Sequence, residues 1–134
     1  MTITQPLRMS LIFSDTEVPI PAVLIYHSRD PYAVLLDTNM GTESHAVWTF
    51  ARDLLADGIS APGSVGDGDV RIMRHAYGAV FMSFTSPEGM ALAEVDADDI
   101  DAFLTKSYAT VPEGTEREHL GMDAELAHLL GEAA

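Results

Sequence analysis

The sequence predicts an α+β domain made of two antiparallel sheet units of about four strands, each unit followed by a helix. Three observations lead to this prediction. Apolar and polar residues alternate over much of the chain, as in strands with one buried face. Residues that favour turns separate these alternating segments at short intervals. Two other segments, beginning at Arg52 and at Asp96, carry the signals of helices instead.

The first unit is expected to be a four-stranded antiparallel meander. Its opening segment places Ile3, Met9 and Leu11 on one face and polar residues on the other. Pro19 and Pro21 cannot donate a ladder hydrogen bond, so they must lie at a sheet edge or before the pairing begins. The four expected strands cover residues 2–13, 18–27, 32–40 and 44–51.

A short helix over residues 52–57 is expected next, with Leu54 and Leu55 facing inward. Gly58 is the residue type that occupies the left-handed position after a helix, so we expect it to end this one. The glycines and the proline of residues 60–68 predict a surface loop.

The second unit is expected to contain strands over residues 69–74, 79–85 and 90–95. Residues 86–89 (SPEG) suit a tight turn between the last two strands, because proline favours its second position and glycine its fourth. Asp96 is a good N-cap, and the helix that it begins should end before Pro112. A final short helix is expected over residues 122–131.

Composition narrows the classes of function. The 134 residues suit a single domain, and no apolar run approaches the roughly 20 residues that span a bilayer. The sequence has no cysteine, which excludes disulfides and thiolate metal sites, and a cytoplasmic protein is expected. The net charge of −14 comes from 21 acidic and 7 basic residues. Such acidity favours solubility or a basic protein partner, and it disfavours binding to nucleic acid or anionic lipid.

No motif amounts to a catalytic or metal site. Glu125 and His128 share a helical face, but di-iron proteins need two such pairs and further glutamates. Residues 116–119 (EREH) are interpreted as a solvated, charged connector. Residues 67–69 (DGD) lack the other ligands of a calcium loop and are expected to form a turn. Trp48 and Phe50 share a strand face, where core packing is favoured over the alternative of base stacking.

An ordered series of blocks resembles the SsgA-like family of sporulation and cell-division proteins of actinobacteria. The longest block is residues 48–58, and the similarity runs from about residue 9 to the C-terminus. In chain order the blocks are VPIPA (18–22), DPYAV (30–34), WTFARDLLADG (48–58), GDVR (68–71), SPEG (86–89) and ELAHLL (125–130).

The resemblance implies a non-enzymatic adaptor that helps to position the septum during sporulation, at the division septum in the cytoplasm. It would act by recruiting or regulating FtsZ or cell-wall remodelling proteins, together with sister SsgA-like proteins. The resemblance also implies a whirly-like fold, a ring-like homo-oligomer that we expect to be a trimer, and no cofactor, catalytic residue or metal ligand. It does not indicate which surface binds partners.

Two other functions are weighed against this one. A whirly-like fold could be a single-stranded nucleic-acid-binding module, but even if Arg29, Arg52, Arg71 and Arg74 shared one groove, neighbouring acids would oppose them. A small cell-wall hydrolase would need converging carboxylates or histidines, and the sequence offers no such pair. For the oligomer, the bulky pairs Val34/Leu36 and Val23/Ile25 indicate apolar sheet faces that a second chain would cover.

Overall fold

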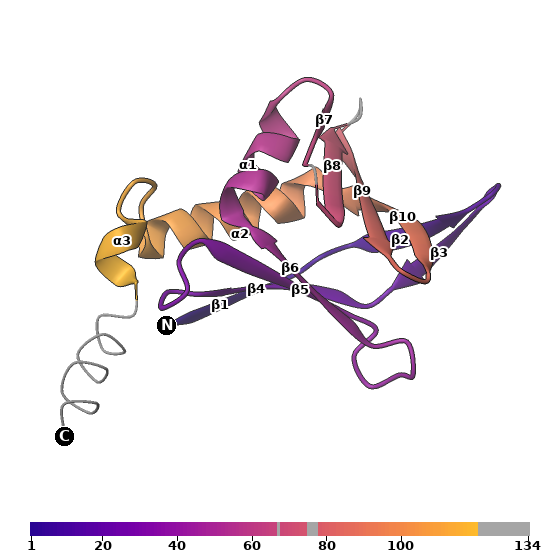
Figure 1. Ribbon diagram of the computed structural model, residues 1–134, viewed down its shortest axis with the longest axis horizontal. Helices are drawn as coiled ribbons and strands as arrows, with labels where there is room; N and C mark the ends of the chain where they lie inside the picture. Colours follow the sequence, from indigo (N-terminus) through magenta and orange to yellow (C-terminus); the bar gives the residue numbers. More distant parts are fainter. Residues whose placement is uncertain (67, 75–77, 121–134) are drawn as a thin grey trace.

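The computed structural model describes residues 1–66, 68–74 and 78–120 and has an α+β architecture of two antiparallel sheets with helices packed against them (Figure 1). Both the class and the two antiparallel sheets were predicted from the sequence. The strands are β1 (Thr2–Pro6), β2 (Met9–Phe13), β3 (Thr16–Ile20), β4 (Ala22–His27), β5 (Ala33–Thr38), β6 (Ala46–Ala51), β7 (Ser64–Val65), β8 (Val70–Arg74), β9 (Ala79–Ser86) and β10 (Gly89–Asp96). The helices are α1 (Arg52–Ser60), α2 (Ala97–Thr110) and α3 (Glu116–His119).

The strand order differs from the expected meander. Sheet A has the order β1-β4-β5-β6, and sheet B has the order β3-β2-β10-β9-β8-β7. The prediction of four long strands in one sheet was therefore wrong, because β2 and β3 belong to sheet B. The expected loop over residues 60–68 was also wrong in part, since it contains the short strand β7.

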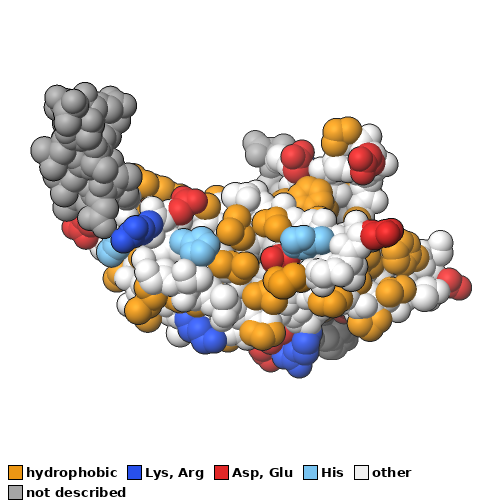
Figure 2. Space-filling model, turned by 90° about the horizontal axis from the view of Figure 1, so that it is seen from below, with side chains coloured by type: hydrophobic (Ala, Val, Ile, Leu, Met, Phe, Trp, Pro, Cys, Tyr) orange, Lys and Arg blue, Asp and Glu red, His pale blue; other side chains and the backbone are white. Residues whose placement is uncertain are grey.

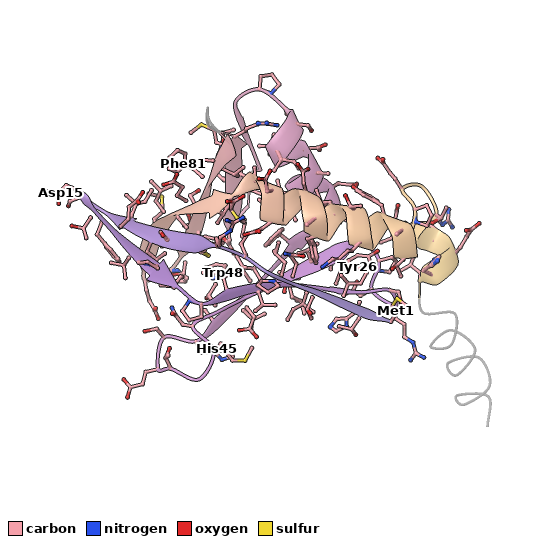
Figure 3. The ribbon with its side chains drawn as sticks, turned by 180° about the vertical axis from the view of Figure 1, so that it is seen from behind. Met1, Asp15, Tyr26, His45, Trp48 and Phe81 are labelled. Carbon is pink, nitrogen blue, oxygen red and sulfur yellow. The ribbon has the colours of Figure 1, made fainter. Side chains whose placement is uncertain are left out.

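One long hairpin explains this difference. β1 pairs with β4 and β2 pairs with β3 in a single continuous register, and the Leu7 N–H donates to the Ala22 carbonyl between the two pairs. The open end of the hairpin, formed by β1 and β4, belongs to sheet A, and its tip, formed by β2 and β3, belongs to sheet B. Figure 3 shows Asp15 at the tip and Met1 at the opposite end. The predicted alternation was therefore real, but it spans two sheets.

The core lies between the two sheets and α2. Phe103 of α2 meets Tyr26 of sheet A edge-on, with ring centroids 6.5 Å apart. At the other end of sheet A, Trp48 packs against Phe84 of sheet B at 5.1 Å. Phe50 is buried beside them, so core packing of this strand face was predicted correctly.

Helix α2 begins as expected, because the Asp96 carboxylate accepts a hydrogen bond from the Asp98 backbone N–H at 2.8 Å. Helix α1 is longer than predicted. Gly58 does not cap it but lies buried inside it, against the side chain of Ile72 in β8. The glycine is thus required for the close approach of α1 to sheet B. The final predicted helix, residues 122–131, lies outside the described residues.

Candidate functional site

The outer face of sheet A carries apolar side chains that reach the surface. Alternation along the strands turns Leu24 and Leu36 into the core and Ile25, Leu35 and Val47 outward. Val47 is half exposed and the other two are half-buried. Figure 2, seen from the side of sheet A, shows hydrophobic side chains gathered there with few charged ones between them. We call Val23, Ile25, Leu35 and Val47 the apolar face of sheet A.

Cross-strand pairing places two of these side chains directly opposite each other and a carboxylate between the other two. Ile25 lies opposite Leu35, while Asp37 pairs with both Val23 and Val47. The Asp37 carboxylate has a partner on the same face, because its Oδ1 lies 2.6 Å from Nε2 of the His45 ring. The apolar Ile25–Leu35 pair thus has Thr4 and Thr49 beyond it in the same row. This arrangement suits contact with another protein, because such interfaces have an apolar centre and a polar rim.

Of the two residue pairs predicted to form apolar faces for a second chain, one lies on the outer face and the other does not. Val34 and Leu36 are fully buried against the core of the same chain, so they leave nothing for a second chain to cover. Val23 and Ile25 do lie on the outer face. Period-two alternation tells which residues share a face, and only the packing of α2 and sheet B decides which face is covered.

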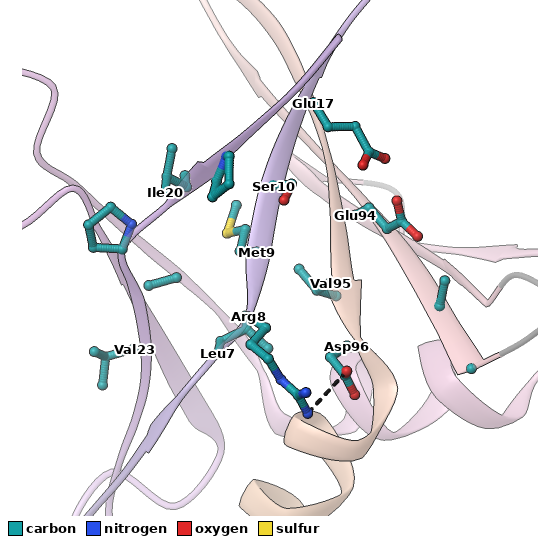
Figure 4. Close-up of a pocket in the computed structure, with 15 residues that line it drawn as sticks. Leu7, Arg8, Met9, Ser10, Glu17, Ile20, Val23, Glu94, Val95 and Asp96 are labelled. Carbon is teal, nitrogen blue, oxygen red and sulfur yellow. Dashed lines mark ion pairs between the residues drawn. The ribbon is translucent and has the colours of Figure 1, made fainter. Parts of the chain in front are cut away.

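A hollow of about 740 Å³ lies where the long hairpin passes from one sheet to the other (Figure 4). Arg8 lines it and binds two carboxylates: its Nε and Nη2 donate to Asp99 at 3.0 and 3.2 Å, and Nη2 lies 3.1 Å from Asp96. The hydrogen bond from Arg8 lowers the pKa of Asp99 despite some desolvation. These carboxylates therefore act in an ion-pair network that ties the segment between β1 and β2 to the start of α2.

The motifs that were weighed as metal sites in the sequence can be placed only in part. Across residues 1–66, 68–74 and 78–120, no three His, Asp or Glu side chains are grouped to hold a metal ion. Glu125 and His128 lie outside the described residues, as does Asp67 of the predicted turn. No helix within the described ranges is long and apolar enough to cross a membrane.

Arg52 has a role that the sequence did not reveal. Its side chain is buried, and its Nη1 donates to the Val111 carbonyl at 2.8 Å. Its Nη2 donates to Glu116 at 3.2 Å. The guanidinium also lies over two aromatic rings, 4.9 Å from the centroid of Tyr26 and 4.3 Å from that of Tyr108. Burial raises the pKa of both phenol groups, so both hydroxyls stay protonated and the rings beside the guanidinium are neutral.

This cluster corrects two interpretations. Arg52 was counted among the cations that might face a nucleic-acid groove, and its burial removes it from any surface. Glu116 was interpreted as part of a solvated connector, yet it accepts from Arg52 and from the Gly114 N–H at 2.7 Å. No local pattern signals this pair, because its two members are far apart in the chain.

Other basic side chains are engaged within the molecule. Arg74 donates to the Ile59 carbonyl at 2.6 Å, and Lys106 donates to the Gln5 amide oxygen at 2.8 Å. Arg71 reaches Ser64 Oγ at 3.3 Å. These contacts belong to different elements and do not form one cationic stripe.

Comparison with known proteins adds the family. The family model described as Streptomyces sporulation and cell division protein, SsgA, matches residues 20–116, well over half of the chain. This chain belongs to the SsgA family. Two of the family blocks found in the sequence map onto these parts: residues 48–58 form most of β6 and most of α1, and residues 18–22 lie where the long hairpin changes sheets.

Relatives from several actinobacteria agree with this placement. The sporulation-specific cell division protein SsgB of Streptomyces coelicolor is 42% identical, over 98% of each chain. SsgB of Frankia casuarinae is 38% identical, over 96% of this chain and 92% of the relative. A solved structure of an SsgA-like sporulation-specific cell division protein from Thermobifida fusca has a TM-score of 0.85 at 34% identity, covering 96% of both chains. These names support a role in cell division.

Proposed function

We propose that this protein is a non-enzymatic adaptor that helps to position the septum during sporulation, acting as a single domain. It recruits or regulates FtsZ or cell-wall remodelling proteins through protein–protein contacts, at the division septum in the cytoplasm. Membership of the SsgA family is the observation that carries this proposal. The apolar face of sheet A supports it, because a surface of this kind is typical of protein docking.

The contact surface can be tested directly. Substituting Ile25→Glu and Leu35→Glu together places two charges in the centre of the apolar face, and Thr105→Glu on the exposed side of α2 serves as the control. Bacterial two-hybrid assays against FtsZ and sister SsgA-like proteins should give signals that the double variant loses and the control keeps. Uniformly negative assays together with normal septation in a deletion strain would overturn the adaptor function.

A homo-oligomer, most simply a trimer, is part of the same proposal. Closed cyclic symmetry would cover apolar sheet surface without leaving a free interface. Light scattering at micromolar concentration should give about three times the 14.5 kDa of one chain, and the glutamate double variant should give a smaller particle. A wild-type mass equal to one chain contradicts the oligomer but not the adaptor.

Nucleic-acid binding separates this proposal from its nearest alternative. We expect no binding, since Arg52 is buried and the net charge is −14. Fluorescence anisotropy with labelled single-stranded oligonucleotides at near-physiological salt measures this. So acidic a surface should repel phosphates. Binding at micromolar concentration or tighter would therefore contradict this expectation and favour the nucleic-acid module.

A further inference from the structure

The edge of β6 exposes backbone hydrogen-bonding groups. The Arg52 N–H donates to the Tyr32 carbonyl just beyond the paired strands, and antiparallel ladders alternate bonded and non-bonded pairs. Phe50 and Trp48 therefore use their backbone groups to bind β5. The N–H and C=O groups of Val47 and Thr49 point away from β5, and no described residue pairs with them.

The other three sheet edges are protected, which sets β6 apart. β3 carries Pro19, and Pro21 follows it, so two backbone donors are missing along that edge. β1 ends in Pro6, and α2 packs against it, with Lys106 bound to Gln5. β7 has only two residues. Folded proteins normally block their edges in these ways, and an unblocked edge of six residues can accept another strand.

A groove runs along this open edge. A hollow of about 540 Å³ is lined by the strand itself, by Leu54 of α1 and by Val70 of β8. Trp48 lines this hollow and also a second one of about 230 Å³, whose other walls include Phe84 and Met90. Trp48 is only half-buried and Met90 is 72% exposed. The two hollows thus share an aromatic floor, which suits apolar side chains that alternate along an extended chain.

The charge at the groove selects the occupant. Asp69 lines the first hollow and Glu88 the second, and neither carboxylate forms an ion pair with a described residue. The chain as a whole carries a net charge of −14. An occupant with lysine or arginine side chains gains favourable electrostatic interactions with these two carboxylates, whereas an acidic segment is repelled from this edge.

We propose that the β6 edge and its groove bind an extended, basic segment of a partner protein, which adds as a fifth strand of sheet A. The backbone of the segment pairs with Val47 and Thr49, its apolar side chains contact Trp48, and its cationic side chains face Asp69 and Glu88. Main-chain pairing would supply affinity, while the groove would supply specificity. This inference rests on the proposed function only in that the protein acts through contacts with other proteins.

The test uses a phage-displayed library of random 12-residue peptides panned on the full-length protein. Thr49→Pro removes an outward N–H from β6. Thr4→Pro is the matched control, because Thr4 lies in the same cross-strand row at the opposite edge and its N–H also points outward. Selected peptides should be basic with alternating apolar residues. They should bind the Thr49→Pro variant at least tenfold more weakly than wild type, and bind the control as wild type.

Three further measurements keep the proposal testable if a proline variant unfolds. Asp69→Lys with Glu88→Lys leaves the backbone intact and should weaken the selected peptides at least tenfold, and methylating alternate peptide nitrogens should abolish binding. Hydrogen exchange of the Val47 and Thr49 amides should slow when peptide is added.

Specific outcomes would overturn the proposal. They are a library that yields no peptide above background, peptides that bind Thr49→Pro as well as wild type, and acidic consensus sequences. Protection of the Thr49 amide that rises with protein concentration alone would assign the edge to a second copy instead. Any of these results would refute this site and leave the adaptor function standing, because the two-hybrid test of that function addresses the apolar face of sheet A.

Discussion

Replacing Arg52 with methionine should destabilise the protein by about 3 kcal/mol. Methionine keeps most of the apolar stem but loses the hydrogen bonds to Val111 and Glu116 and both aromatic contacts. Hydrogen bonds to a charged group contribute about 1.5–3 kcal/mol each, and the Val111 carbonyl would remain buried without its donor. Breaking a buried ion pair costs roughly 3–5 kcal/mol. We expect the lower end because the Glu116 side chain is 14% exposed and can regain water.

The assay is urea unfolding followed by circular dichroism, with a thermal melt as a second measure. For a chain of 134 residues, a loss of about 3 kcal/mol corresponds to a fall in Tm of about 11 °C. Arg71→Met is the control, because Arg71 is exposed and contacts Ser64 at 3.3 Å, and it should change stability by less than about 0.5 kcal/mol.

A double-mutant cycle separates the ion pair from general packing. Glu116→Gln keeps an oxygen for the Gly114 N–H and removes the charge that faces Arg52. The double variant should be about 1.5–2 kcal/mol more stable than the sum of the single effects predicts, since each single change already breaks the same pair. The reasoning fails if the effects add, or if Arg52→Met unfolds with the same midpoint as Arg71→Met.

Two further predictions concern packing and pH. Gly58→Ala should destabilise the protein by about 1–3 kcal/mol although alanine favours helices, because the added Cβ overlaps Ile72. Gly68→Ala is the control and should be neutral, since open space surrounds Gly68. Equal unfolding midpoints for the two variants would contradict the overlap. The Asp99 pKa is lowered in the folded state, so its ion pair contributes fully above the unfolded value of about 3.9, and this contribution is lost progressively as pH falls through the lower folded value. The stability gap between wild type and Arg8→Met, measured by urea unfolding from pH 7 to pH 3, should therefore narrow in acid. A gap independent of pH would contradict this.

The sequence by itself determined the local elements. Alternation revealed the strands, and the turn between β9 and β10 and the Asp96 cap of α2 were placed correctly. These features depend on residues within a few positions of each other, so a single sequence carries their signal. The same kind of local evidence led to the family blocks, and the comparisons confirmed the family.

The tertiary structure alone decided which elements meet. The same alternation of apolar and polar residues fits a hairpin that lies in one sheet and a hairpin that spans two. Only the packing showed that β2 and β3 join sheet B. Gly58 resembled a helix end until Ile72, 14 residues later, was placed against it. Arg52 and Glu116 are 64 residues apart, and the edge of β6 is open because no strand among the described residues lies beside it. Long-range contacts cannot be inferred from the spacing of residues along one sequence, because they depend on which faces of the helices and sheets pack together in the core.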